Sequence, residues 1–156
     1  MREFRYEIFA DYHQFYLQDD DQSKGDLSEA WTKEATERLL AVAPHVIGVG
    51  TVRNMTVPVS ISVHDSRPKI REEEWDQITT ASLKIDTGRI VVAGCTDYFP
   101  EAARIDVKPG VYEAIVCYGK LNSLSADGFE GDDLYCVHLF PGGEIPPSVV
   151  KKRKNA

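Results

Sequence analysis

The chain has 156 residues, of which 42% are apolar, and a formal net charge of −7. This length and apolar fraction are ordinary for one globular domain with its own core. No stretch approaches the roughly 18 apolar residues of a membrane-spanning helix, and an acidic protein repels nucleic acid while attracting basic partners. We therefore expect no membrane and no direct nucleic-acid partner, and a basic protein as the favoured partner.

The terminal segments and the cysteines give information about the cellular compartment of the protein. Residues 1–7 are charged and lack an apolar run, so we expect no secretory signal. Cys95, Cys117 and Cys136 lie far apart in apolar runs, which predicts free thiols packed as small hydrophobic groups. Residues 151–154 are all basic, and we expect a solvated terminus there rather than a contact with nucleic acid or a membrane. Together these features predict a cytoplasmic protein.

A change of parity marks the first strand region. Apolar side chains occupy even positions in residues 4–8 and odd positions in residues 15–17. Side chains alternate with period two along a strand, so the switch predicts a bulge or bend near Asp11, where the chain crosses to another sheet or turns a corner. The run Asp19-Asp20-Asp21 follows, and we expect it to form an acidic surface loop.

One segment has helical periodicity. Asp26 is suited to cap a helix, with Glu29 as the partner in a capping box. The helix is predicted to run to about Val42, before Pro44. Its apolar face would consist of Trp31, Ala35, Leu39 and Val42.

The rest of the chain is predicted to form strands. Gly48 and Gly50 indicate a bulge or close packing, and Pro58 indicates an edge strand. Asp86-Thr87-Gly88 has the composition of a hairpin turn, and residues 90–93, apolar on both faces, indicate a central strand. The predicted strands cover residues 45–52, 56–63, 75–85, 89–95, 103–107, 111–118 and 134–140.

Seven to nine short strands with one helix predict a mainly β protein, an antiparallel β-sandwich with one covering α-helix. No linker divides the chain. We expect a single domain over residues 1–140, followed by an irregular tail over residues 141–156.

Several residues occur in the order typical of a known family. They are Tyr12-His13-Gln14-Phe15, Trp31, Ala35, Arg53-Asn54, Pro109-Gly110, Tyr112, Cys117 and Tyr135. In this order, over most of residues 8–140, the chain resembles the competence protein J family, inhibitors of the competence DNA-entry nuclease. The resemblance implies a protein without catalysis that binds and blocks a nuclease. The chain departs from the family in longer loops at 96–102 and before Leu134 and in its tail, so its partner can differ.

Three acidic groups are candidates for contacting such a partner. A nuclease has a basic groove for the phosphate backbone, and carboxylates on an inhibitor can occupy that groove. The alternative is that the groups are solvated loop charges that keep the protein soluble. The candidates are Asp19, Asp20 and Asp21; Glu72, Glu73 and Glu74; and Glu130, Asp132 and Asp133.

Metal and enzyme chemistry are less well supported. Residues 127–133 offer oxygen ligands without the spacing of an EF-hand, and the four histidines share no element, so we expect no metal and no cofactor. Cys95 is a conceivable nucleophile, but a buried structural cysteine is the favoured interpretation, which predicts a non-enzyme. Arg53 and Asp97 are predicted to pair and hold two loops together.

A second function stays open. A small-ligand-binding sandwich would have a pocket lined by aromatic side chains, although aromatic residues at these positions can equally form core. The candidate lining residues are Tyr12, Trp75, Tyr112 and Tyr118. The sequence identifies neither the partner nor the ligand, and it leaves a homo-oligomer open.

Overall fold

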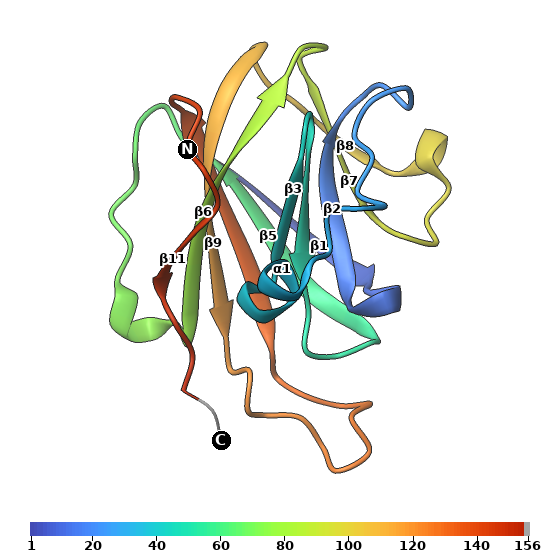
Figure 1. The fold of residues 1–156 in the computed structure, drawn as a ribbon, viewed down its shortest axis with the longest axis vertical. Coiled ribbons are helices and arrows are strands. Elements are labelled where there is room, and N and C mark those ends of the chain that lie inside the picture. Colours follow the sequence, from blue (N-terminus) through green and yellow to red (C-terminus); the bar gives the residue numbers. More distant parts are fainter. Residues whose placement is uncertain (155–156) are drawn as a thin grey trace.

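The computed structural model describes residues 1–154, and eleven strands in this range form two sheets (Figure 1). The first sheet contains β1 (Arg2–Phe9), β5 (Thr56–Val63), β10 (Leu134–Pro141), β9 (Gly110–Gly119), β6 (Gln77–Ile85) and β11 (Ser148–Lys151), in this order. The second contains β3 (Leu40–Ala43), β4 (Val46–Gly50), β2 (Gln14–Asp19), β7 (Arg89–Gly94) and β8 (Ala103–Asp106). The strand pairs are antiparallel, except that β5 and β10 run parallel.

The core lies between the two sheets. Buried side chains such as Ile61 and Val116 of the first sheet belong to one cluster with Leu17, Ile47 and Val92 of the second. This arrangement confirms the predicted mainly β sandwich with one helix. It has more strands than expected because β3 lies in the predicted helix and β11 in the predicted irregular tail.

The crossing between the sheets lies where the parity changes. β1 belongs to the first sheet and β2 to the second, and the 3₁₀ turn η1 (Asp11–His13) joins them. The predicted bend near Asp11 is confirmed. Tyr12 and His13 both have positive φ angles, of 60° and 58°.

The helix is shorter than its periodicity predicts. α1 (Lys33–Arg38) begins after Thr32, whose Oγ1 accepts a hydrogen bond from the N–H of Ala35 at 3.1 Å. It ends at Leu39, which has a φ of 61°. The predicted bounds of 26 and 42 are wrong because residues 40–43 pair with β4 as β3 instead of continuing the helix.

The two glycines of β4 explain how this segment packs. A Cβ added at Gly48 would lie 3.0 Å from the Trp31 ring, and one added at Gly50 would lie 3.0 Å from Cα of Leu39. The absence of side chains therefore lets the segment before β3 lie directly on the sheet. The predicted close packing is confirmed.

Two strand predictions need correction. Pro58 does not lie in an edge strand, since β5 has β1 on one side and β10 on the other. Pairing with β10 begins only at Val59, so the proline precedes the doubly paired part of the strand. Asp86-Thr87-Gly88 is a turn with Gly88 at a φ of 78°, but it joins β6 to β7 in the other sheet and is no hairpin.

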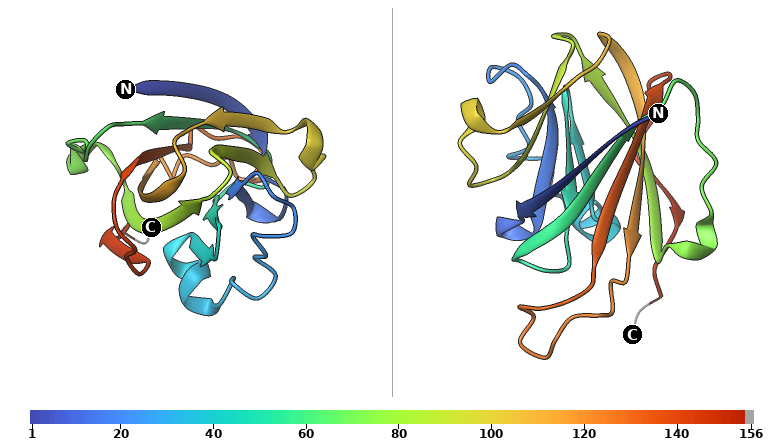
Figure 2. Two further views of the ribbon diagram at one scale, coloured as in Figure 1. Left: turned by 90° about the horizontal axis from the view of Figure 1, so that it is seen from above. Right: turned by 180° about the vertical axis from the view of Figure 1, so that it is seen from behind.

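The C-terminal segment is more ordered than predicted. β11 pairs with β6 at one edge of the first sheet (Figure 2), so residues 148–151 are not irregular, although three of these four residues are exposed. Beyond the strand, the N–H of Arg153 lies 3.4 Å from Oε1 of Gln77. Among residues 1–154, no helix has the length and apolar character needed to cross a membrane.

Candidate functional site

The three predicted acidic groups do not share one surface. Residues 19–21 lie at the end of β2, at one end of the long axis, and residues 130–133 lie in the loop at the opposite end (Figure 1). The third group forms the 3₁₀ turn η2 (Glu72–Glu74) before β6, where Lys151 Nζ donates to the carbonyl of Glu72 at 2.8 Å. A single basic groove would meet one of these groups rather than all three.

Asp19 is fully buried, contrary to the expectation of a surface loop. Its Oδ2 accepts a hydrogen bond from the N–H of Asp86 at 2.8 Å, and its Oδ1 accepts from the N–H and Oγ1 of Thr87 at 3.0 and 2.6 Å. Burial alone would raise the pKa of Asp19, but these hydrogen bonds outweigh it and hold the pKa below its ordinary value. The side chain fastens the end of β2 to the turn after β6.

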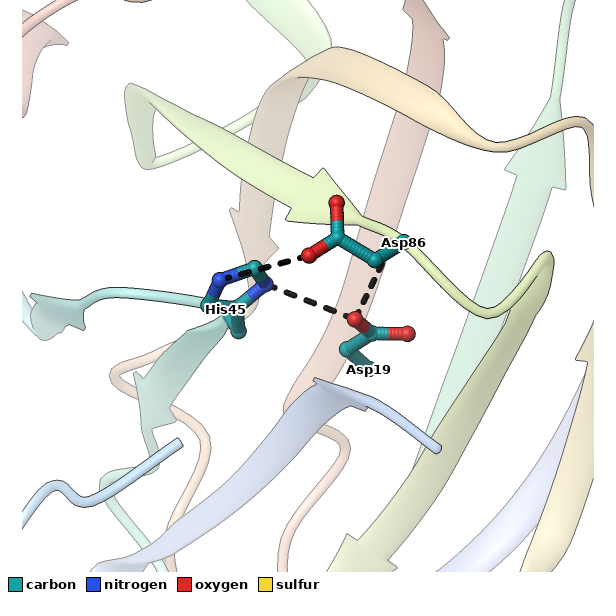
Figure 3. Close-up of side chains that lie close together, drawn as sticks. All are labelled: Asp19, His45 and Asp86. Atoms are coloured by element: carbon teal, nitrogen blue, oxygen red, sulfur yellow. Dashed lines mark hydrogen bonds and ion pairs between the residues drawn. The ribbon is translucent and has the colours of Figure 1, made fainter. Parts of the chain in front are cut away.

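A charged network surrounds Asp19 (Figure 3). His45 Nδ1 lies 3.4 Å from Asp19 Oδ2, and its Nε2 lies 3.7 Å from Asp86 Oδ2. Lys24 Nζ pairs with the same Asp86 oxygen at 3.0 Å. Sequence reasoning missed this group because its members come from separate segments and the histidine has no partner at a fixed spacing.

The network has the donor types of a cation site but is already satisfied. One ligand atom from each of Asp19, His45 and Asp86 lies within 4.8 Å of the others. Asp19 accepts three hydrogen bonds, however, and the ammonium of Lys24 already neutralises Asp86. The arrangement is that of a structural ion-pair network that joins three segments.

Asp133 is buried as well, so it is not part of the acidic surface. Its Oδ1 lies 2.9 Å from Arg53 Nε, and its Oδ2 accepts from the hydroxyl of Tyr135 at 2.7 Å. The predicted pair of Arg53 with Asp97 is therefore wrong. Asp97 instead accepts a hydrogen bond from the N–H of Gly94 at 2.8 Å.

The remaining carboxylates differ in their burial and in the partners that they already have. Asp20 is half-buried and forms two hydrogen bonds of 3.1 Å with the guanidinium of Arg104. Asp21 accepts hydrogen bonds within its own turn from Ser23. The exposed members are Glu72, Glu73, Glu74, Glu130 and Asp132, and their contact with a partner stays a prediction.

A different surface combines exposed aromatic side chains with unpaired carboxylates. It lies at the bend between β1 and β2, and we call it the corner surface. Its apolar members are Phe9, Tyr12, Met55 and Tyr98, which are 42, 71, 36 and 68% exposed. Its acidic members are Glu7, Asp11, Asp97 and Glu101, which form no ion pair with any residue in the range 1–154.

Backbone contacts hold the corner surface together. The N–H of Ala10 donates to the carbonyl of Met55 at 3.0 Å. Gly94 lies against the carbonyl of Phe9 so closely that a Cβ there would clash. A hollow of about 330 Å³ lies beside this contact. Its lining includes Tyr6, Glu7, Asp97, Tyr98 and Glu101.

The bend itself is held in a strained conformation. A left-handed residue other than glycine costs roughly 1–2 kcal/mol, and Tyr12 and His13 are two in succession. Hydrogen bonds to His13 compensate: its N–H donates to Asn54 Oδ1 at 3.2 Å, and its carbonyl accepts from the N–H of Thr51 at 2.9 Å. Strain of this kind is concentrated at functional sites, which makes the bend a candidate for binding.

One solved structure has a similar architecture. It is the crystal structure of ComJ, inhibitor of the DNA degrading activity of NucA, from Bacillus subtilis. The likeness has a TM-score of 0.66 and 17% sequence identity, and it covers 91% of this chain and 96% of that one. The chain has a ComJ-like fold. The resemblance to the competence protein J family is thus confirmed for the fold.

A second structure, described as crocagin biosynthetic gene J, has a TM-score of 0.59 at 20% identity and covers 92% of this chain and 100% of that one. No family model and no curated protein matches the sequence. At these identities the likeness to ComJ establishes the fold, and the function is argued separately below.

The ComJ-like fold does not contain the predicted aromatic pocket. Tyr112 and Tyr118 are buried in the core between the sheets. Trp75 packs against a separate small cluster, while Tyr12 is exposed. These four residues therefore do not line one pocket.

The cysteines differ from expectation at one position. Cys95 follows β7 and is exposed, whereas Cys117 is buried and Cys136 is half-buried. Partial burial, together with the charge of Asp11, raises the pKa of Cys95. A catalytic thiol requires a lowered pKa, so the surroundings of Cys95 do not activate it.

Proposed function

We propose that this protein is a non-catalytic, cytoplasmic inhibitor of a nuclease. The observation that carries the proposal is the ComJ-like fold, because the ComJ structure is described as an inhibitor of the DNA degrading activity of NucA. The net charge of −7 supports a basic partner, as a nuclease groove is. Opposite charges on the two proteins would raise their rate of association.

The corner surface is the contact that the geometry favours. Binding energy in protein interfaces is concentrated in exposed aromatic anchors surrounded by a polar rim. Tyr12 and Tyr98 would supply such anchors, and the unpaired carboxylates of the corner surface would supply an acidic rim. The exposed acidic residues of η2 and of the loop before β10 are the competing contacts.

The test is a DNA-degradation assay with a purified nuclease encoded beside the gene of this protein. Added protein should reduce the initial rate, and raising the DNA concentration should restore it, because both bind the same groove. Inhibition should weaken at higher salt, since exposed charges are screened beyond about 10 Å at 0.1 M salt. A nuclease that degrades DNA at the same rate with a molar excess of the protein would overturn the proposal.

A further inference from the structure

A second hollow, which we call the Arg153 pocket, has the size of a ligand site. Its volume is about 660 Å³, and pockets for small molecules in proteins occupy roughly 300–1,000 Å³. It lies where η1, the segment leading into α1, the end of β4 and the C-terminal residues meet. Its lining includes Tyr12, His13, Gln14, Trp31, Leu39 and Arg153.

The pocket has two aromatic walls, of which the Trp31 ring is held in a fixed position. Nε1–H of Trp31 donates to Oε1 of Gln14 at 2.9 Å, and the ring covers Gly48, where no side chain displaces it. Tyr12 lies on the left-handed backbone of the bend, is 71% exposed and forms the other aromatic wall. Aromatic rings at a pocket offer faces against which a planar group can stack.

The polar atoms of the pocket have defined roles. His13 Nδ1 lies 3.1 Å from the carbonyl of Thr51, and a carbonyl only accepts, so the neutral ring carries its proton on Nδ1 and leaves Nε2 as an acceptor. Gln14 uses its oxygen for Trp31, which leaves its amide nitrogen as a donor. These groups offer hydrogen-bonding positions that can orient a ligand.

Arg153 supplies the charge. The strand pairing of β11 and the bond of its own N–H to Gln77 place it at the pocket. Among residues 1–154, no carboxylate lies within ion-pair distance of its guanidinium. A half-buried guanidinium without a partner favours a carboxylate or phosphate, which it can bind through two hydrogen bonds.

We propose that the Arg153 pocket binds a small planar ligand that carries one anionic group. The ring stacks against Trp31 and Tyr12, and the anion pairs with Arg153. An aromatic carboxylate and a nucleoside monophosphate share this chemistry. A nucleic-acid strand does not fit, because the net charge of −7 repels a polyanion. The proposal does not rest on nuclease inhibition, although the pocket and the corner surface share Tyr12.

The test uses the full chain and two probes, 4-hydroxybenzoate and adenosine monophosphate, with adenosine as the uncharged control. The two tryptophans give separate indole N–H signals in a ¹H–¹⁵N spectrum, so Trp75 is an internal control for Trp31. We expect at least one anionic probe to shift the Trp31 signal saturably while leaving that of Trp75 unchanged. The more strongly binding probe identifies the source of the anion, and adenosine should bind about tenfold more weakly than its monophosphate.

Two matched variants distinguish binding by Arg153 in the pocket from a general effect of the net charge. R153Q should weaken binding of that probe about tenfold or more, the effect of losing a charge-assisted hydrogen bond. K152Q removes the same charge one residue earlier, at a side chain outside the pocket, and should leave affinity unchanged. Circular dichroism checks that both variants fold. The proposal is overturned if neither anion shifts Trp31, if adenosine binds equally well, or if R153Q and K152Q have equal effects.

Discussion

The three consecutive residues Asp19, Asp20 and Asp21 have different roles because their surroundings differ. The odd position of Asp19 continues the inward face of Phe15 and Leu17, so the side chain enters the molecule, where hydrogen bonds replace water. Asp20 points to the other face and pairs with Arg104, and Asp21 stabilises its own turn. The parity of the strand predicts the direction of Asp19, but its partners come from a turn almost seventy residues away and are not predictable from spacing.

Asp19→Asn should destabilise the fold by about 1–3 kcal/mol, because the amide cannot accept all three hydrogen bonds without placing a donor among them. Urea denaturation measures this loss. The exposed Asp132→Asn is the control and should stay within about 0.5 kcal/mol of the wild type. Equal effects at the two positions would contradict the structural role of Asp19.

Stability of the Asp19 variant should also depend on pH. The pKa of Asp19 is lowered in the folded protein, so its ionised form stabilises the fold above the unfolded-state pKa of about 4. This contribution is lost as the pH falls through the folded-state pKa. The difference in unfolding free energy between the wild type and Asp19→Asn should therefore become smaller on acidification. A difference that stays constant with pH would contradict a stabilising role of ionised Asp19.

The thiols should react in the order of their exposure. Cys95 should label first with a thiol reagent under native conditions, whereas burial protects Cys117 and raises its pKa to about 12. Because the pKa of Cys95 is raised too, its labelling rate should increase steadily with pH around neutrality. Cys95→Ser should abolish the fast phase. A fast phase that survives this substitution would show that a second thiol is accessible.

Among the elements, those with clean alternation were the most predictable. β5 has the predicted bounds of 56 and 63, and the predicted strand 111–118 differs from β9 by one residue at each end. The segment 39–43 was not predictable, because its apolar residues suit a helix face and a strand equally. Pairing with β4, which lies beyond a turn, decides in favour of the strand.

The packing of the segment before β3 on β4 should be sensitive to volume. Gly48→Val places methyl groups where the Trp31 ring lies, so we expect a loss of about 1–3 kcal/mol and a shift in tryptophan emission. Gly143→Ala is the control, since nothing lies within 4 Å of its added Cβ. Unchanged stability and emission in Gly48→Val would mean that the ring does not cover the glycine.

For the molecule as a whole, acidity could be predicted from composition, but its distribution could not. Asp19 and Asp133 are inside, and the exposed groups lie far apart, because the fold brings together segments that are distant in sequence. In the sequence, the corner surface was indicated only by two separate segments, the run Tyr12-His13-Gln14 and the loop at 96–102. Neither segment indicates by itself that the other lies beside it.

Charge reversal at two positions can locate the contact with the nuclease. Glu7→Lys with Glu101→Lys changes the corner surface, and Glu72→Lys with Glu73→Lys changes the net charge equally at η2. We expect the first pair to slow association with the nuclease at low salt about tenfold or more relative to the second, as measured by surface plasmon resonance. A third pair, Glu130→Lys with Asp132→Lys, tests the loop before β10. A larger effect at η2 or at this loop would move the contact there.

The strand order has a kinetic consequence. The first sheet pairs β1 with β5, β5 with β10, and β6 with β11, and the members of each of these pairs are separated by tens of residues along the chain. Closing such long loops is entropically costly before any contact compensates, and sandwiches of this kind refold in milliseconds to seconds. While β10 is undocked, the backbone edges of β5 and β9 are open to pairing between chains. Aggregation during refolding should therefore increase steeply with protein concentration, even though the finished sheet leaves only β1 and β11 at its borders.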